Sequence, residues 1–162
     1  MNGTELLPEF DQEMASTRKM LERVPDEHLA FKPHDKSFSL LELASHVATL
    51  PTWVGVALNT TEMDLDQPWD RPDLTARREL LEAFDKAVKD ARPVLESASA
   101  DDFAVTWTLR SSDQVWFAMP RSAVYRSFAL NHLIHHRAQL GVYLRLLDVP
   151  VPGMYGPSAD ES

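Results

Sequence analysis

Apolar residues recur every three or four positions in four separate segments of the 162-residue chain, and this spacing constrains the fold more than any other feature. Because an α-helix turns once in about 3.6 residues, such spacing places the apolar side chains on one face, which must be buried. Four helices of this kind predict an all-α fold. The first is predicted to end before Pro25. Its apolar face comprises Leu7, Phe10, Met14, Thr17, Leu21 and Val24.

Capping residues and prolines indicate where the next two helices begin and bend. Ser39 and Glu42 have the spacing of a capping box, so the second helix is predicted to begin at Ser39, and Pro51 should kink it. Its inward face takes Leu43, His46 or Val47, Leu50, Trp53 and Ala57. After an irregular segment over residues 59–73, Asp73 is predicted to cap the third helix, and Pro93 should bend it. The third apolar face comprises Leu80, Leu81, Phe84, Val88, Ala91 and Leu95.

Residues 101–119 alternate between apolar and polar side chains around a polar turn, which indicates a short extended hairpin or an extended crossover. The fourth helix is predicted from about Pro120 to about Asp148. It carries two stripes, one of Tyr125, Phe128, His132, His136 or His135, Gln139, Tyr143 and Leu146, and one of Ala129, Leu133, Leu140, Leu144 and Leu147. We therefore expect one domain over residues 1–162, a four-helix bundle with a long connection before its last helix and a coil tail over residues 150–162.

The charge and the cysteine count narrow the function classes. A formal net charge of −9 repels phosphate backbones and anionic headgroups, so the sequence predicts neither a nucleic-acid partner nor a membrane partner. Cysteine is absent, which excludes disulfides, thiolate metal sites and a cysteine nucleophile. The N-terminus lacks the basic start and apolar run of a signal peptide, so we expect a cytoplasmic protein.

The strongest chemical signal lies in the segment that contains His132, His135 and His136. Residues four apart on a helix are neighbours one turn apart, so His132 and His136 can converge on one metal ion. His132 with His135 is also geometrically possible. His135 and His136 point about 100° apart and do not easily share this role. The alternative is three ordinary surface or hydrogen-bonded histidines.

His46 strengthens the metal hypothesis, because it falls on the predicted inward face of another helix. A buried imidazole without a partner is costly, and one site that takes all three rings satisfies each of them. The alternative for His46 is a core histidine bonded to a carbonyl or to Glu42. His28 and His34 lie in the polar connection over residues 25–38 and are expected to be exposed. The aromatic residues Trp53, Trp107, Trp116 and Phe117 are of a kind more often found in the core than in a ligand site, but some of them can wall a pocket beside the metal.

Three segments resemble a known family. Residues 37–46, read Ser-Phe-Ser-Leu-Leu-Glu-Leu-Ala-Ser-His, resemble the second-helix entry of the DinB/YfiT-like superfamily of damage-inducible proteins, which is distinct from the DNA polymerase that shares the name. Residues 131–140 resemble its metal motif in the fourth helix, with Ala138 where the family usually has glycine. The segments 143–145 and 151–161 are similar to the tail of many members.

This resemblance implies an up-down-down-up bundle with a long crossover between helices 3 and 4, and a homodimer. It also implies a metal held by His46, His132 and His136, which assigns the last ligand to His136 rather than His135. Characterised relatives include thiol-dependent S-transferases and a mycothiol-dependent isomerase.

Three histidine ligands leave a coordination position open, which is typical of a catalytic metal. We expect a divalent ion, zinc first, with nickel or another transition metal as alternatives. The first hypothesis is an enzyme that transfers a low-molecular-weight thiol to an electrophilic small molecule. The alternatives are a metal-dependent hydrolase and a non-catalytic module that binds a metal or ligand.

Overall fold

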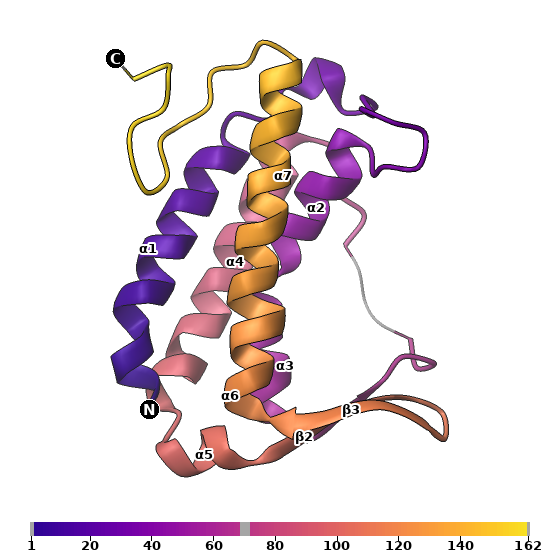
Figure 1. The fold of residues 1–162 in the computed structure, drawn as a ribbon, viewed down its shortest axis with the longest axis vertical. Helices are drawn as coiled ribbons and strands as arrows, with labels where there is room; N and C mark the ends of the chain where they lie inside the picture. Colours follow the sequence, from indigo (N-terminus) through magenta and orange to yellow (C-terminus); the bar gives the residue numbers. More distant parts are fainter. Residues whose placement is uncertain (1, 69–71, 162) are drawn as a thin grey trace.

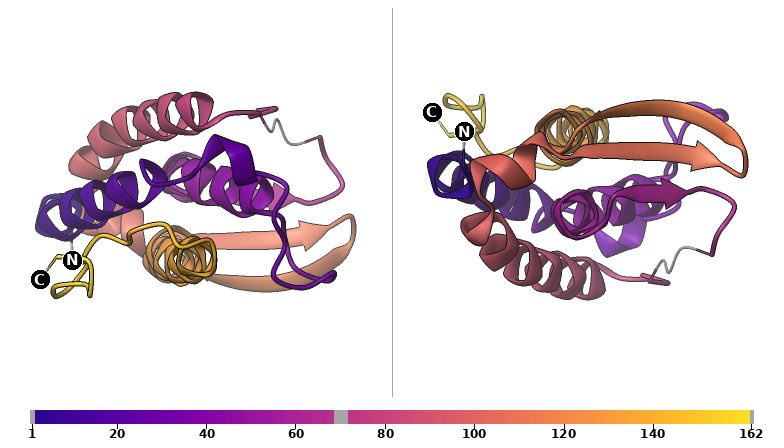
Figure 2. Two further views of the ribbon diagram at one scale, coloured as in Figure 1. Left: turned by 90° about the horizontal axis from the view of Figure 1, so that it is seen from above. Right: turned by 90° about the horizontal axis from the view of Figure 1, so that it is seen from below.

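The computed structural model describes residues 2–68 and 72–161, and helices form most of it. The long helical segments are α1 (Gly3–Leu21), α2 (Leu40–Thr49) with α3 (Thr52–Asn59), α4 (Arg77–Ser97), and α7 (His132–Leu146). In Figure 1, α1 and α7 run in one direction, whereas α2, α3 and α4 run in the opposite direction. Seen along the helices, α2 lies between α4 and α7, so residues on its two sides meet different neighbours (Figure 2).

Capping groups fix the starts of the first two helices. Ser39 caps α2 and forms the predicted box with Glu42, which confirms that helix start. The helix α1 begins earlier than its apolar stripe indicated, because Asn2 and Glu5 form a second capping box. Gly3 then donates its N–H to Ala98 O at 2.8 Å. A Cβ at Gly3 would overlap the carbonyl oxygen of Leu95, so the end of α4 can approach the start of α1 only at a glycine.

Two proline and capping expectations need correction. Pro51 does not merely kink one helix: α2 ends at Thr49 and α3 begins at Thr52, because proline lacks the N–H that would continue the first helix. Asp73 does not cap the third long helix, which begins at Arg77 after Ala76. There the backbone N–H of Thr75 donates to the Glu79 carboxylate at 2.7 Å instead.

A small sheet corrects the all-α prediction. The strands β2 (Thr106–Ser111) and β3 (Gln114–Pro120) form the antiparallel hairpin that the alternation indicated. The strand β1 (Glu62–Asp64), from the segment expected to be irregular, pairs parallel with β2. Arg110 on β2 holds this edge together through Asp64 at 2.6 Å and Glu62 at 2.7 Å. The short helix α5 (Ala100–Ala104) precedes the hairpin, which projects from one end of the molecule (Figure 1).

The last helical segment is not uniform. The short helix α6 (Arg121–Val124) leads into η2 (Tyr125–Asn131), which has the wider π-helical hydrogen bonding, and then into α7. Because a π-turn shifts the helical register, the predicted stripe divides here. Tyr125 packs with Phe103 in the main core, while Phe128 packs against Trp53 and Phe117 in a second cluster.

The segment after α7 folds back on α1. Tyr155 accepts a hydrogen bond from Arg137 Nη2 at 2.8 Å and donates to the carboxylate of Glu13 on α1. Arg137 and Glu13 themselves form a buried ion pair at 2.7 Å. This network joins α1, α7 and the C-terminal segment in one place.

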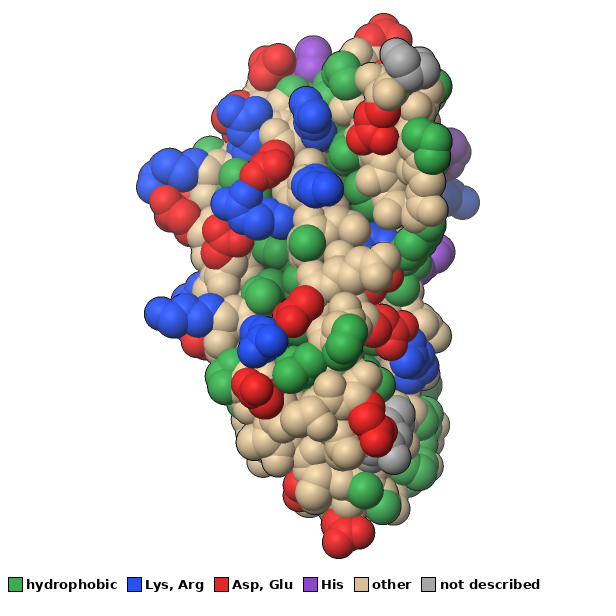
Figure 3. All heavy atoms as spheres, turned by 90° about the vertical axis from the view of Figure 1, so that its left-hand side faces the viewer, with side chains coloured by type: hydrophobic (Ala, Val, Ile, Leu, Met, Phe, Trp, Pro, Cys, Tyr) green, Lys and Arg blue, Asp and Glu red, His purple; other side chains and the backbone are tan. Residues whose placement is uncertain are grey.

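Acidic and basic side chains are interspersed on the face shown in Figure 3. Ion pairs such as Arg18–Asp85 and Arg92–Asp11 join α1 to α4. Among the described residues, no helix is both long enough and apolar enough to cross a membrane. Near the start of the chain a further short helix, η1 (Asp26–His28), lies in the predicted connection.

Candidate metal centre

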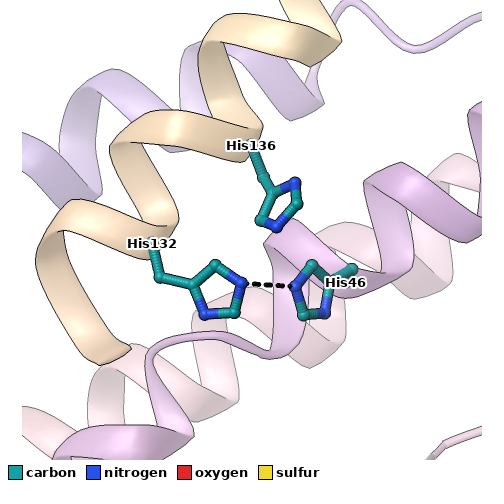
Figure 4. Close-up of side chains that lie close together, drawn as sticks. All are labelled: His46, His132 and His136. Atoms are coloured by element: carbon teal, nitrogen blue, oxygen red, sulfur yellow. Dashed lines mark hydrogen bonds between the residues drawn. The ribbon is translucent and has the colours of Figure 1, made fainter. Parts of the chain in front are cut away.

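Three histidines from two helices meet in the structure. His46 lies in the last turn of α2, and His132 and His136 lie in the first two turns of α7 (Figure 4). The His46 ring centroid is 4.8 Å from that of His132 and 4.5 Å from that of His136. One nitrogen from each ring can be chosen so that all three lie within 4.8 Å of one another. Sequence positions 86 residues apart are thus brought to one point.

Two of the ring nitrogens already have the spacing of ligands on a tetrahedral metal ion. His46 Nε2 lies 3.1 Å from His132 Nε2. Zinc–nitrogen bonds of about 2.0–2.1 Å separate two tetrahedral ligand nitrogens by about 3.3 Å, so these two rings need almost no rearrangement. All three rings are partly buried, which limits competition from water without closing the site.

Neighbouring groups orient two of the rings. His136 Nδ1 lies 2.7 Å from Gln139 Oε1, one turn later on α7. In the tautomer where Nδ1–H donates to this oxygen, Nε2 keeps the lone pair that a metal needs. On His132, Nδ1 is buried and the Phe128 carbonyl is the polar group that interacts with the ring, while Nε2 faces His46. The two rings on α7, those of His132 and His136, therefore both present Nε2 as the available ligand atom.

The surroundings favour neutral imidazoles. Burial lowers the pKa of His132, and the neighbouring His136 and His135 lower it further, against an opposing effect of the Phe128 carbonyl. Burial also lowers the pKa of His136, although its hydrogen bond with Gln139 raises it. A lowered histidine pKa means that the ring is unprotonated at neutral pH, which is the form that binds a metal.

The other histidines lie outside this group. His28 and His34 are exposed, as predicted. His135 is exposed as well, and although its ring is 4.8 Å from that of His136, it is not one of the three that come together. Glu42, the alternative partner for His46, accepts the Ser39 N–H at 2.6 Å in the capping box.

A cavity of about 1240 Å³ adjoins the cluster, and both His46 and His132 line it. Trp53 on α3 and Phe128 on η2 line it too, with ring centroids 5.2 Å apart. Trp53 thus takes the wall position expected of some aromatic residues, whereas Trp107 is fully buried and Trp116 is exposed. The sequence placed Phe128 on the stripe of His132 and His136 but gave no sign that it would form a cavity wall with Trp53.

Comparison with known proteins gives one consistent family. The model of the DinB family matches residues 1–162. The uncharacterised protein YrdA of Bacillus subtilis is 24% identical over 160 residues, which cover 96% of this chain and 89% of the relative. A DinB-like protein from Bacillus cereus has a similar crystal structure, with a TM-score of 0.71, 23% identity, and coverage of 93% of this chain and 95% of that one. The DinB-like protein YjoA of Bacillus subtilis gives a TM-score of 0.67 at 17% identity, covering 90% and 95% of the two chains.

Proposed function

The chain belongs to the DinB family, and from this premise we propose that His46, His132 and His136 hold one divalent metal ion in a catalytic site. The observation that carries the proposal is the meeting of three imidazoles from α2 and α7, two of which, His46 and His132, line a large cavity. Structural zinc is usually closed by four protein ligands, whereas three leave a position for a reactant. Imidazole ligands suit zinc first, and also nickel and other transition metals.

The residues around the cluster would each contribute one task. A divalent ion bound by three neutral imidazoles keeps its full charge and supplies Lewis-acid stabilisation of an anionic reactant. Gln139 would hold the His136 ring by accepting a hydrogen bond from Nδ1–H, which leaves Nε2 for the metal. Trp53 and Phe128 exclude water from the side of the cavity next to His132.

The reaction we propose is transfer of a low-molecular-weight thiol to an electrophilic small molecule. Among the described residues that line the cavity, the carboxylates are Glu42, Asp73 and Asp90. Glu42 is engaged at the start of α2, and Asp90 pairs with Lys86 at 2.6 Å, which leaves Asp73 as the remaining lining carboxylate that could act as a general base. A thiol ionises at a pKa about seven units below that of water, so it depends least on such a base.

A colorimetric transfer assay tests this function. Zinc-reconstituted protein would be mixed with a panel of small thiols, including cysteine and glutathione, and with chlorodinitrobenzene. In the reaction, the thiol sulfur bonds to the ring carbon, chloride leaves, and the thiol proton passes to buffer. We expect turnover above that of free zinc, with loss to background in His46→Ala and full activity in His28→Ala, the exposed control.

Other outcomes identify the alternatives. Ester hydrolysis without thiol consumption would replace the transferase with a metal-dependent hydrolase. Tight zinc binding with no turnover of any substrate in the panel would contradict the enzyme and favour a non-catalytic binding module.

We also propose to class the helices as a four-helix bundle of up-down-down-up order with a long crossover. The support is the shared direction of α1 and α7, opposite to that of α2, α3 and α4 (Figure 1). The connection between α4 and α6 contains α5, β2 and β3, which is long for a bundle loop.

A further inference from the structure

The second hydrophobic cluster of the molecule lies beside the cavity rather than in the main core. Its fully buried members are Ala57, Trp107 and Val124. Its outer members include Trp53 and Phe128, which are only half-buried and line the cavity together with Leu109 and Met63. Apolar rings left partly exposed at a concave surface are typical of a ligand site rather than of a folding core.

Three rings of this cluster follow one another, and two of them, Phe128 and Trp53, line the cavity that His46 and His132 also line. Phe117 and Phe128 have centroids 5.1 Å apart and planes 26° apart, and Phe128 and Trp53 follow at 5.2 Å and 33°. Aromatic rings at this spacing attract one another, and a further flat aromatic ring in the cavity can pack against Phe128 and Trp53 in the same way. Trp107 supports Trp53 from behind at 6.1 Å, and its Nε1–H donates to Thr60 Oγ1 at 2.9 Å.

The charges that line the cavity argue against an anionic occupant at this wall. Three carboxylates, those of Glu42, Asp73 and Asp90, line the cavity with a single basic residue, Lys86, among the described residues. Lys86 is itself paired with Asp90. An anionic ligand away from the metal would thus be repelled by the net negative charge of the lining. An uncharged ring meets no such electrostatic repulsion.

Resting on the proposed metal site, we propose that Trp53 and Phe128 bind the uncharged aromatic body of the electrophilic substrate and hold it beside His46 and His132. The cavity of about 1240 Å³ exceeds the common range of about 300–1,000 Å³ for small-molecule pockets. This volume accommodates the two reactants of a transfer reaction together. The aromatic wall would then determine which electrophiles the enzyme accepts.

Binding of naphthol to the metal-free protein tests this proposal independently of the metal and of any turnover. Equilibrium dialysis would measure its affinity for wild type, Trp53→Ala and Phe128→Ala. Each truncation should weaken binding by about tenfold or more, since it removes an aromatic face from the contact. The matched control is Trp116→Ala: Trp116 lies on β3, is 62% exposed and does not line the cavity, so its loss should leave the affinity unchanged.

Two further comparisons keep the result interpretable. Trp53→Leu keeps an apolar side chain at this position, so a folded Trp53→Leu protein with weakened binding assigns the effect to the aromatic ring rather than to apolar character alone. Naphthalenesulfonate should bind more weakly than naphthol because of the lining carboxylates. Wild-type naphthol affinity in both alanine variants, or a sulfonate that binds as tightly as naphthol, would overturn the proposal. Failure of the transfer assay with naphthol binding intact would instead count against the proposed reaction alone.

Discussion

Arg137→Met should destabilise the protein more than most single substitutions, because it leaves a buried carboxylate without its counter-ion. The Arg137 side chain is 2% exposed and that of Glu13 is 7% exposed. Arg137 donates to the Glu13 carboxylate at 2.7 Å, to the Glu13 carbonyl at 3.1 Å, to Thr17 Oγ1 at 3.1 Å and to Tyr155 at 2.8 Å. Methionine fills similar space and replaces none of these contacts.

Removing one partner of a buried ion pair costs about 3–5 kcal/mol, which is a large share of the stability of a single domain. For a chain of this size, the loss should lower the urea midpoint by about 2 M, measured by far-ultraviolet circular dichroism. The matched control is Arg145→Met on the same helix. Arg145 is half-exposed and pairs with Asp160, so its loss should cost no more than about 1 kcal/mol.

The double variant Glu13→Leu/Arg137→Met distinguishes a stranded charge from lost packing. Replacing both charges with apolar groups should recover much of the loss, since no buried carboxylate is then left unpaired. If Arg137→Met shifts the midpoint no more than Arg145→Met does, the reasoning from burial is wrong.

Three other predictions concern the site and the core. His136→Gln should abolish metal binding and His135→Gln should not; metal loss only in the latter would contradict the ligand assignment. Tyr125→Phe should raise the free energy of unfolding by about 1 kcal/mol, because the buried Tyr125 hydroxyl makes no hydrogen bond to the described residues; a less stable variant in thermal unfolding would refute this. Burial lowers the folded pKa of His132 and His136, so the unfolded chain binds more protons. The stability of the metal-free protein should thus be full above the unfolded pKa of about 6.5 and fall as pH drops through the lowered folded pKa. A wild-type melting temperature that is constant from pH 8 to pH 5 would contradict this. So would an equal fall in melting temperature in a variant in which both His132 and His136 are replaced.

The sequence predicted a helix start correctly where the capping residues lie within one turn of each other. Ser39 and Glu42 satisfy each other within one turn, so their pattern can be read from sequence alone. The prediction that Asp73 caps the third helix was wrong, because the Glu79 carboxylate accepts a hydrogen bond from the Thr75 N–H at the observed start of α4. The strand β1 was missed because its three residues become a strand only by pairing with β2, far along the chain.

The site was predictable to the extent that it depends on helical spacing. His132 and His136 are one turn apart on α7, and His46 lies on the inward face of α2, so sequence indicated that the three can meet. The aromatic wall pairs Trp53 on α3 with Phe128 on η2, and neither their contact nor the π-helical hydrogen bonding of η2 has a sequence signal that we could recognise. The Arg137–Glu13 pair joins residues 124 positions apart and gives no local pattern either.

Metal content per chain tests the central claim most directly. Protein purified without chelator or nickel resin would be reconstituted with Zn²⁺, desalted and measured by elemental analysis. The three-histidine site predicts one ion per chain in wild type and in His28→Ala, and almost none in His46→Ala, which removes the only ligand from α2. A His46→Ala protein that folds normally and still carries one ion per chain would contradict the account.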